Sequence, residues 1–422
     1  MSKKLRKKNI LQPETSPKNS LKTKRIIVCL CRIILVGEYN PRIGGIMNRP
    51  PLSQLHGYLR NMMDKRQAGK VLHKLEDILF IAVVATIANA SCWEEVADFA
   101  KTRVNWLRQY IELPGGAPSH DTFERTFKWI DGKQFERCFI LWMREVCQEK
   151  GFRVIAIDGK TMRGSGDKAL NKRPLHIVSA WTSENNMVLG QVKTEEKSNE
   201  IDAIPSLLEL LDVRGAVVTI DAIGTQKQIA DQIISQQADY ILSVKKNQRT
   251  MYEDIETLAR MEGSNGYREI SHEYYKTLEK GHGRIEEREY WLIPDVKWAS
   301  WHADWKGLGA IGIVKRRVIK GSETSEEMAY YITSLKKNVQ QFATGVRSHW
   351  GIESMHWTLD VVLNEDRRIV RKDNGPRNLA VLKRMALNII RADTTFEKAS
   401  GSRKRFRACM NTDYLENVLS NM

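Results

Sequence analysis

Two stretches decide the fold: Val154-Ile-Ala-Ile-Asp158-Gly159 and Val217-Val-Thr-Ile-Asp221-Ala-Ile-Gly224. Each is an apolar run of strand length that ends in an aspartate and passes into a loop containing glycine. If the two strands are neighbours in one sheet, Asp158 and Asp221 converge, and two carboxylates so close require a cation between them. The pattern therefore predicts a site for Mg²⁺ or Mn²⁺ at the sheet edge. The alternative is that each aspartate only caps the turn after its strand.

The segments around these stretches predict an α/β fold with a ribonuclease-H-like core. Strands are expected at 154–157, 176–181, 187–192, 216–220 and 240–244, and helices at 203–211 and 226–237. Three strands, a helix and a strand follow one another in the order of ribonuclease H. Because helix 226–237 joins two neighbouring strands by a crossover, those two strands must be parallel.

The rest of the chain differs in pattern from this core. Apolar residues recur at helical spacing from 52 to about 150, and a helix near Thr122 has Ser119 or Asp121 as its expected cap. An antiparallel β insertion is expected from strand-like runs at 267–274, 284–292, 310–318 and 328–333. Long helices are expected at 339–363 and 379–390.

These patterns predict five parts. They are 1–46, a basic extension; 47–150, an amino-terminal helical domain; 151–265, the first part of the core; 266–335, the β insertion; and 336–422, a carboxy-terminal helical part of the core with a basic tail. The helical domain is open to two interpretations, a helix-turn-helix that contacts DNA or a packing domain.

Basic charge is concentrated in two segments. The chain has 422 residues, 42% of them hydrophobic, which is enough for a large core and a smaller domain. Its formal charge is +16, with 16 basic against three acidic residues in 1–70 and 13 against five in 364–407. Because the remainder is slightly acidic, the surplus predicts two surfaces that contact a polyanion such as DNA. Ordinary solvated charge is the alternative for the second segment.

Several other classes of protein are disfavoured. The six cysteines show no paired spacing and no histidine cluster, which disfavours a zinc site or a disulfide framework and favours the cytoplasm. The apolar run 26–36 is interrupted by Arg32, and no later run approaches 18 apolar residues. A soluble cytoplasmic protein without a membrane partner is expected. Met47 offers an alternative start, in which case residues 1–46 lie upstream of the natural protein.

A third carboxylate is expected from the segment Arg347-Ser-His-Trp-Gly-Ile-Glu353-Ser-Met-His-Trp-Thr-Leu-Asp360. Its helical spacing places Glu353 and Asp360 on one face, together with His349 and His356. The alternative is a helix of hydrogen-bonded histidines and core tryptophans, and for the histidines alone that alternative is preferred.

Long strings of this sequence resemble the H-repeat-associated (ISAs-type) transposases, a branch of the insertion-sequence DDE transposase superfamily. They are IAIDGKTMRGS, LHIVSAWTSENNMVLGQVKTEEKSNEI, VVTIDAIGTQKQIADQI, HGRIEEREYW and HWGIESMHWTLDVVLNEDRR. The resemblance covers residues 52–390 and implies that Asp158, Asp221 and Glu353 are the catalytic triad. It also implies a β insertion, for which the 131 residues between Asp221 and Glu353 leave room.

One departure from the wider class concerns the glutamate helix. That class has a tyrosine seven before, an arginine four before and a lysine seven after the glutamate, where this chain has Val346, His349 and Asp360. The DNA contacts of the class therefore do not carry over, although His349 stays among the candidate DNA-binding residues.

The reaction expected from these acids is metal-dependent phosphoryl transfer. Two ions of Mg²⁺ or Mn²⁺ held by Asp158, Asp221 and Glu353 are expected to activate water for an in-line attack at phosphorus, and the freed 3′ hydroxyl then attacks target DNA. The expected partners are the element's terminal inverted repeats and target DNA, bound by a homodimer. One alternative is a ribonuclease-H-like nuclease that cuts without joining. A catalytically inactive DNA-binding relic is disfavoured because all three acids are present.

Candidate DNA contacts are basic residues near the acids. Lys160 and Arg163, just past the first aspartate, are expected to hold the scissile phosphate. The residues expected to neutralise flanking phosphates are Arg367, Arg368, Arg371 and Lys372. Ordinary surface charge is the alternative for this second group. The loop 245–248 and the turn 280–284 are weaker candidates.

Overall fold

The computed structural model describes residues 53–67, 69, 71–147, 153–194, 200–281 and 283–421, all within the unit Pro50–Met422. The expectations for residues 1–46, including the apolar run 26–36, lie outside the described residues. None of the described helices is long and apolar enough to cross a membrane.

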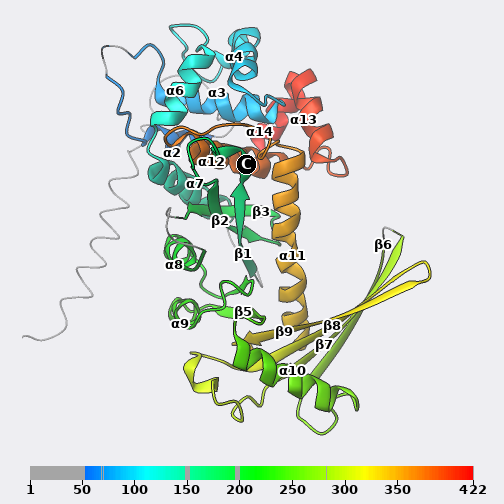
Figure 1. The fold of residues 1–422 in the computed structure, drawn as a ribbon. Helices are drawn as coiled ribbons and strands as arrows, with labels where there is room; N and C mark the ends of the chain where they lie inside the picture. The colour runs from blue at the N-terminus through cyan, green and yellow to red at the C-terminus, as the bar shows by residue number, and fades with distance from the viewer. Residues whose placement is uncertain are drawn as a thin grey trace, which may run out of the picture. The chain divides into compact units, whose positions relative to one another are not determined.

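The half of the sheet that carries the two aspartates follows the predicted order (Figure 1). Its strands are β1 (Arg153–Met162), β2 (Leu175–Thr182), β3 (Met187–Lys193), β4 (Ala216–Ile220) and β5 (Asp239–Val244). β1 runs antiparallel to β2 and parallel to β4, and β4 is parallel to β5. Helices α8 (Glu200–Leu210) and α9 (Lys227–Ser235) connect the strands on either side of them in the chain. The five strands and two helices predicted here are confirmed, with ends that shift by a few residues.

β1 continues past the aspartate at which it was expected to end. The strand runs through Asp158 and Gly159 to Met162 and pairs with β2 along this whole stretch. Gly159 is therefore a strand residue and does not begin a loop. β4, by contrast, ends at Ile220, and Asp221 starts the turn that follows, as predicted.

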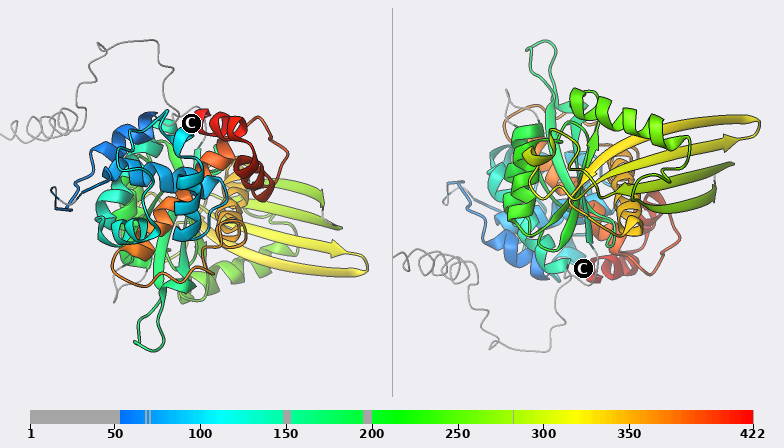
Figure 2. Two further views of the ribbon diagram at one scale, coloured as in Figure 1. Left: turned by 90° about the horizontal axis from the view of Figure 1, so that it is seen from above. Right: turned by 90° about the horizontal axis from the view of Figure 1, so that it is seen from below.

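The second half of the sheet consists of two antiparallel hairpins, β6 (Glu273–Gly281) with β7 (Arg284–Ile293) and β8 (Ala310–Lys320) with β9 (Glu323–Thr333). β9 pairs with β5, so the described residues form one nine-stranded sheet in the order β3-β2-β1-β4-β5-β9-β8-β7-β6. Figure 2 shows the far ends of both hairpins projecting beyond the helices.

One expected strand of this half was wrong. Residues 267–274 were expected to be extended, yet β6 begins only at Glu273. Gly266 and Tyr267 both have positive φ, at 70° and 60°, so the chain turns there after helix α10 (Arg249–Gly263). Tyr267 is buried at this turn, and its backbone N–H donates to the Glu262 carbonyl. The apolar character of the segment therefore reflects burial of a turn.

The remaining helices come from both ends of the described chain. They are α2 (Ser53–Arg60), α3 (Leu75–Ile87), α4 (Trp93–Thr102), α5 (Val104–Leu107), α6 (His120–Trp129), α7 (Gly132–Val146), α12 (Gly375–Ala392), α13 (Gly401–Met410) and α14 (Thr412–Ser420). α12 packs against α3, α6 and α7, and nearly all of its residues from Gly375 to Ile390 are buried. The Ser119 hydroxyl caps α6 by accepting a hydrogen bond from Thr122 N–H, as expected.

Helix α11 (Val339–Val361) confirms the long helix expected at 339–363 and crosses the sheet (Figure 1). It contacts β6 and β7 as well as β1 and β4, so it links the two halves. Near its start, Phe342 is fully buried between Tyr290 and Tyr331, which contributes roughly 2–3 kcal/mol of hydrophobic stabilisation. Further along, a side chain on Gly351 would lie 2.7 Å from the Trp181 indole nitrogen. Glycine at this position lets the helix approach β2 closely.

Candidate active site

The two aspartates lie side by side because their strands are parallel neighbours in register. Ile157 pairs with Ile220, so Asp158 and Asp221 occupy matching positions just beyond that pair. Asp158 accepts a hydrogen bond from Gly159 N–H at 2.8 Å. Asp221 accepts from Ile223 N–H at 3.2 Å and also from Gly224 N–H. The alternative reading, in which Asp221 caps its turn, therefore also holds, and it orients the carboxylate beside Asp158.

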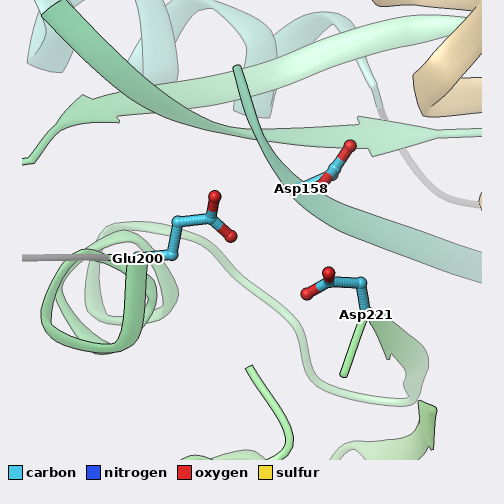
Figure 3. Close-up of side chains that lie close together, drawn as sticks. All are labelled: Asp158, Glu200 and Asp221. Atoms are coloured by element: carbon cyan, nitrogen blue, oxygen red, sulfur yellow. The ribbon is translucent and has the colours of Figure 1, made fainter. Parts of the chain in front are cut away.

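A third acid joins them that the sequence analysis did not single out. Glu200, the first residue of α8, reaches toward Asp158 and Asp221 (Figure 3). Among the described residues, these three form the one cluster of possible metal ligands whose ligand atoms all lie within 4.8 Å of one another. In the sequence, Glu200 is marked only by its place in one of the strings that resemble the H-repeat-associated transposases, before the helix expected at 203–211. It does not follow an apolar strand-like run, which is the pattern that singled out the two aspartates.

The electrostatics of the cluster favour a cation. Burial raises the pKa of Asp158 to about 7, and the charges of Asp221, Glu200 and Glu353 add to this against the Gly159 hydrogen bond. Burial and the charge of Glu200 likewise raise the pKa of Asp221. Carboxylate oxygens are the ligands that Mg²⁺ and Mn²⁺ prefer, so the donor set fits the metal expected from the sequence.

Glu353 lies on α11, outside the three-acid cluster. It is exposed and lines a cleft of about 200 Å³ that also contains Asp221, Lys245, Arg288 and Arg316. The cleft is therefore bordered by α11, by the strand ends of the first half of the sheet and by the β7–β8 pair. The charge of Glu353 contributes to the raised pKa of Asp158.

The two histidines of α11 contact residues of β4 and β1. The Nδ1 atom of His349 lies 3.0 Å from the Thr219 hydroxyl, and burial lowers the pKa of this histidine to about 4. Nδ1 of His356 lies 3.5 Å from the Asp158 carboxylate, and burial lowers its pKa to about 3. Both rings are neutral, so neither offsets the charge of the acids. The two tryptophans are not core residues, since Trp350 is 38% and Trp357 62% exposed.

The predicted DNA contacts divide into two groups. Three of the seven predicted residues make contacts with other parts of the protein. The Lys160 ammonium is buried between Asp360, Glu365 and Asp366 at 2.7–3.3 Å. His349 contacts Thr219, and Arg368 stacks on Trp93 and donates to the Ser91 carbonyl.

The second group faces solvent. Its members are Arg163, Arg367, Arg371 and Lys372. The Arg163 side chain is 85% exposed with one long contact to Asp366, and Arg371 pairs with Asp167 at 2.9 Å. All seven assignments stay predictions, and this second group is the one available to a phosphate backbone.

Comparison with known proteins gives the family. Residues 149–389 match the family described as Transposase DDE domain, and residues 56–143 match the one described as DDE_Tnp_1-associated. The chain is 42% identical over 375 residues to "Putative transposase YncI" of Escherichia coli O157:H7, covering 87% of this chain and 95% of that protein. It is 39% identical over 376 residues to "H repeat-associated putative transposase YhhI" of Escherichia coli K12, covering 87% and 98%.

One solved structure is a distant neighbour, a synaptic complex of piggyBac transposase with hairpin DNA. It aligns with a TM-score of 0.41 and 12% identity over 87% of this chain and 81% of that one, a likeness too weak to carry an argument. The matched DDE domain and the relatives aligned over almost their full length are sufficient: this chain belongs to the DDE transposase family, among the H repeat-associated transposases.

Proposed function

We propose that this chain cuts DNA at the ends of an insertion sequence and joins the freed 3′ hydroxyl groups to target DNA. Asp158, Asp221 and Glu353 are the catalytic acids of the proposal, and they hold two ions of Mg²⁺ or Mn²⁺. The observation that carries it is the parallel pairing of β1 with β4, which brings Asp158 and Asp221 together in a chain of the DDE family.

The proposed architecture keeps the predicted parts. The segments 151–265 and 336–422 form a ribonuclease-H-like core, 266–335 is an insertion, and 47–150 is an amino-terminal helical domain. Support comes from the path of the chain, since β9 returns from the hairpins to pair with β5 and α11 then crosses back over β4 and β1.

The residues of the chain have distinct tasks in this proposal. A divalent metal supplies activation of water and stabilisation of the charge that develops on phosphate oxygens. Asp158, within β1, and Asp221, directly after β4, would hold it, and Glu353 would approach from α11 at the cleft. His356 contributes no charge, and Nδ1 of its buried ring lies 3.5 Å from the Asp158 carboxylate.

A basic surface formed by two segments of the chain suits the DNA backbone. The solvent-facing cations of 367–372 lie beside the β1–β2 connection, because Lys172 contacts the Arg371 carbonyl and Gly164 packs against the Arg368 carbonyl. That connection adds three more exposed cations, namely Lys168, Lys172 and Arg173. We assign the flanking-phosphate contacts to this combined surface, with a homodimer pairing two DNA ends in the bacterial cytoplasm.

Substitution of the acids tests the proposal. Asp158→Asn, Asp221→Asn and Glu353→Gln should each reduce Mn²⁺-dependent cleavage of DNA carrying the element's terminal repeats by about a thousandfold, the equivalent of several kcal/mol of transition-state stabilisation. Binding of the same DNA, measured by fluorescence anisotropy, should change less than threefold. Glu209→Gln, an exposed acid on α8, is the control. Full cleavage by any of the three variants removes that residue from the triad.

A strand-transfer assay distinguishes the competing readings. A pre-cleaved end with a free 3′ hydroxyl should join to a supercoiled target plasmid. Cleavage without joining would favour the ribonuclease-H-like nuclease. Binding without cleavage in any divalent metal would favour the DNA-binding relic.

A further inference from the structure

Glu200 occupies an unusual place for a surface acid. Its side chain is only 13% exposed, and its carboxylate lies in the cluster with Asp158 and Asp221 (Figure 3). Gathering a third negative charge there is unfavourable for folding, since like charges at short range repel. The position therefore calls for a role other than stability.

A histidine holds this carboxylate in place. Nε2 of His176 lies 2.7 Å from Glu200 Oε1, and Nδ1 lies 2.9 Å from the Thr161 hydroxyl. A carboxylate only accepts hydrogen bonds, so Nε2 carries a proton and donates to Glu200, and in the neutral ring Nδ1 accepts from the Thr161 hydroxyl. His176 and Thr161 are paired across β2 and β1, so the orientation of the ring is built into the sheet. One oxygen of Glu200 is engaged by His176, and a metal requires only the other.

The strand also leaves room for Glu200. A side chain on Gly159 would overlap the Glu200 carboxylate and His176 Nε2. Gly159 lies within β1 and its φ is not positive, so no turn requires glycine here. The glycine directly after Asp158 is thus explained by the space that Glu200 and His176 occupy.

We propose that Glu200 is a fourth metal-binding carboxylate of the site. His176 orients it through a hydrogen bond, and Gly159 leaves the space that its side chain occupies. The proposal rests on the metal-dependent function above and deepens it. Glu200, Asp158 and Asp221 form the inner group of ligands, and Glu353 joins them from the cleft. His176 is a positioning residue, equivalent to the hydrogen-bonding partners that orient metal ligands in other proteins.

Calorimetric titration of the full chain with Mn²⁺ alone tests this without reference to activity. Glu200→Gln keeps the shape and the hydrogen bond to His176 but removes the charge, and it should weaken Mn²⁺ binding at least tenfold. Glu200→Asp should recover part of the loss. Asp202→Asn, an exposed acid in the same first turn of α8, is the matched control and should bind within twofold of the wild type.

The supporting residues make a second arm. His176→Ala should weaken Mn²⁺ binding about tenfold, the size found for partners that orient metal ligands, and His176→Gln should restore part of it by keeping an N–H donor. Gly159→Ala should match Glu200→Gln. Gly57→Ala, where a side chain meets open space, should leave Mn²⁺ binding unchanged.

Thermal unfolding without metal separates a ligand from a structural contact. Glu200→Gln should leave the metal-free Tm unchanged or raise it, because a repelling charge is removed. The proposal would be overturned if Glu200→Gln lowered the metal-free Tm and Glu200→Asp bound Mn²⁺ no more tightly than Glu200→Gln. So would wild-type Mn²⁺ affinity in Glu200→Gln while Asp158→Asn binds none, a result that leaves the proposed function standing. If the wild-type chain itself binds no Mn²⁺, both fail.

Discussion

At the residue scale, the partly buried carboxylates of Asp158 and Asp221 are repelled by the other acids around them. Burial and three neighbouring acids raise the pKa of Asp158 to about 7, and the adjacent His356 is neutral. A bound cation relieves this repulsion only in the folded chain. Mn²⁺ at about 100 times its Kd should therefore stabilise the fold by about 2.7 kcal/mol, a rise of several degrees in Tm. In Asp158→Asn the rise should largely vanish, and an equal rise in both proteins would contradict the assignment.

Asp77, on α3, gives a second residue-scale prediction. It is buried in the first turn of α3, where burial, aided by Glu76 and opposed by Lys74, raises its pKa to about 6. Because this exceeds the unfolded value of about 3.9, the folded chain holds the proton more tightly. The stability that protonation confers is present below pH 4 and is lost as pH rises through 6. Between pH 4.5 and 7 the unfolding free energy of the wild type, measured by urea unfolding, should fall by on the order of 2–3 kcal/mol. In Asp77→Asn this fall should be absent. Parallel pH profiles for both proteins would refute the shift.

At the element scale, α11 is anchored beyond its end by a buried cluster of charges. Glu365 is completely buried, and although burial alone would raise its pKa, Arg384 and Lys160 hold it at about 2. Asp360 on α11 contacts Lys160 on β1, and Glu365 contacts Arg384 on α12. The cluster therefore ties the glutamate helix to the strand of Asp158.

The same cluster decides between two roles for Lys160. If it anchors α11, Lys160→Met should lower the unfolding free energy by about 3–5 kcal/mol, because breaking a buried ion pair leaves charges uncompensated. The salt dependence of DNA binding should not change. A phosphate contact predicts the reverse, an unchanged urea midpoint and a salt slope smaller by about one.

The contact between α11 and β2 makes Glu353 sensitive to packing. Gly351→Ala places a methyl group 2.7 Å from the Trp181 indole nitrogen, so the helix must shift away from the sheet. A displacement of about 1 Å at a catalytic residue costs about a hundredfold in rate. Cleavage should fall by that order while the variant stays folded by circular dichroism. Thr344→Ala, on an exposed face of the same helix, is the control, and undiminished cleavage by Gly351→Ala would show that α11 need not lie this close.

At the scale of the whole molecule, DNA binding depends on a surface assembled from distant segments. The β1–β2 connection and residues 367–372 are adjacent in space although about 200 residues apart. Arg367→Gln combined with Lys372→Gln should reduce the slope of log K against log salt by about 1.8, equally for any DNA sequence. Lys101→Gln, exposed on α4, should leave it unchanged. An unaltered slope in the double variant would exclude this surface.

The sequence could predict the parts whose signals are local. The strands of Asp158 and Asp221 were readable from apolar runs, and the parallel pairing of the Asp221 strand with the strand after it followed from the crossover helix between them. The length and face of α11 followed from helical spacing. Tyr267 was misread because apolar character marks burial, and a buried turn and a strand share it.

What the sequence by itself determined was the order of strands and helices and the place of an aspartate after each of two apolar runs, since both depend on neighbours within a few residues. Only the tertiary structure decided that β1 pairs with β4, that Glu200 joins the two aspartates in the space left by Gly159, and that Lys160 and Arg368 contact other parts of the protein. The physical reason is that burial and charge pairing are set by residues that meet only on folding, in the case of Lys160 and Asp360 across 200 positions of chain.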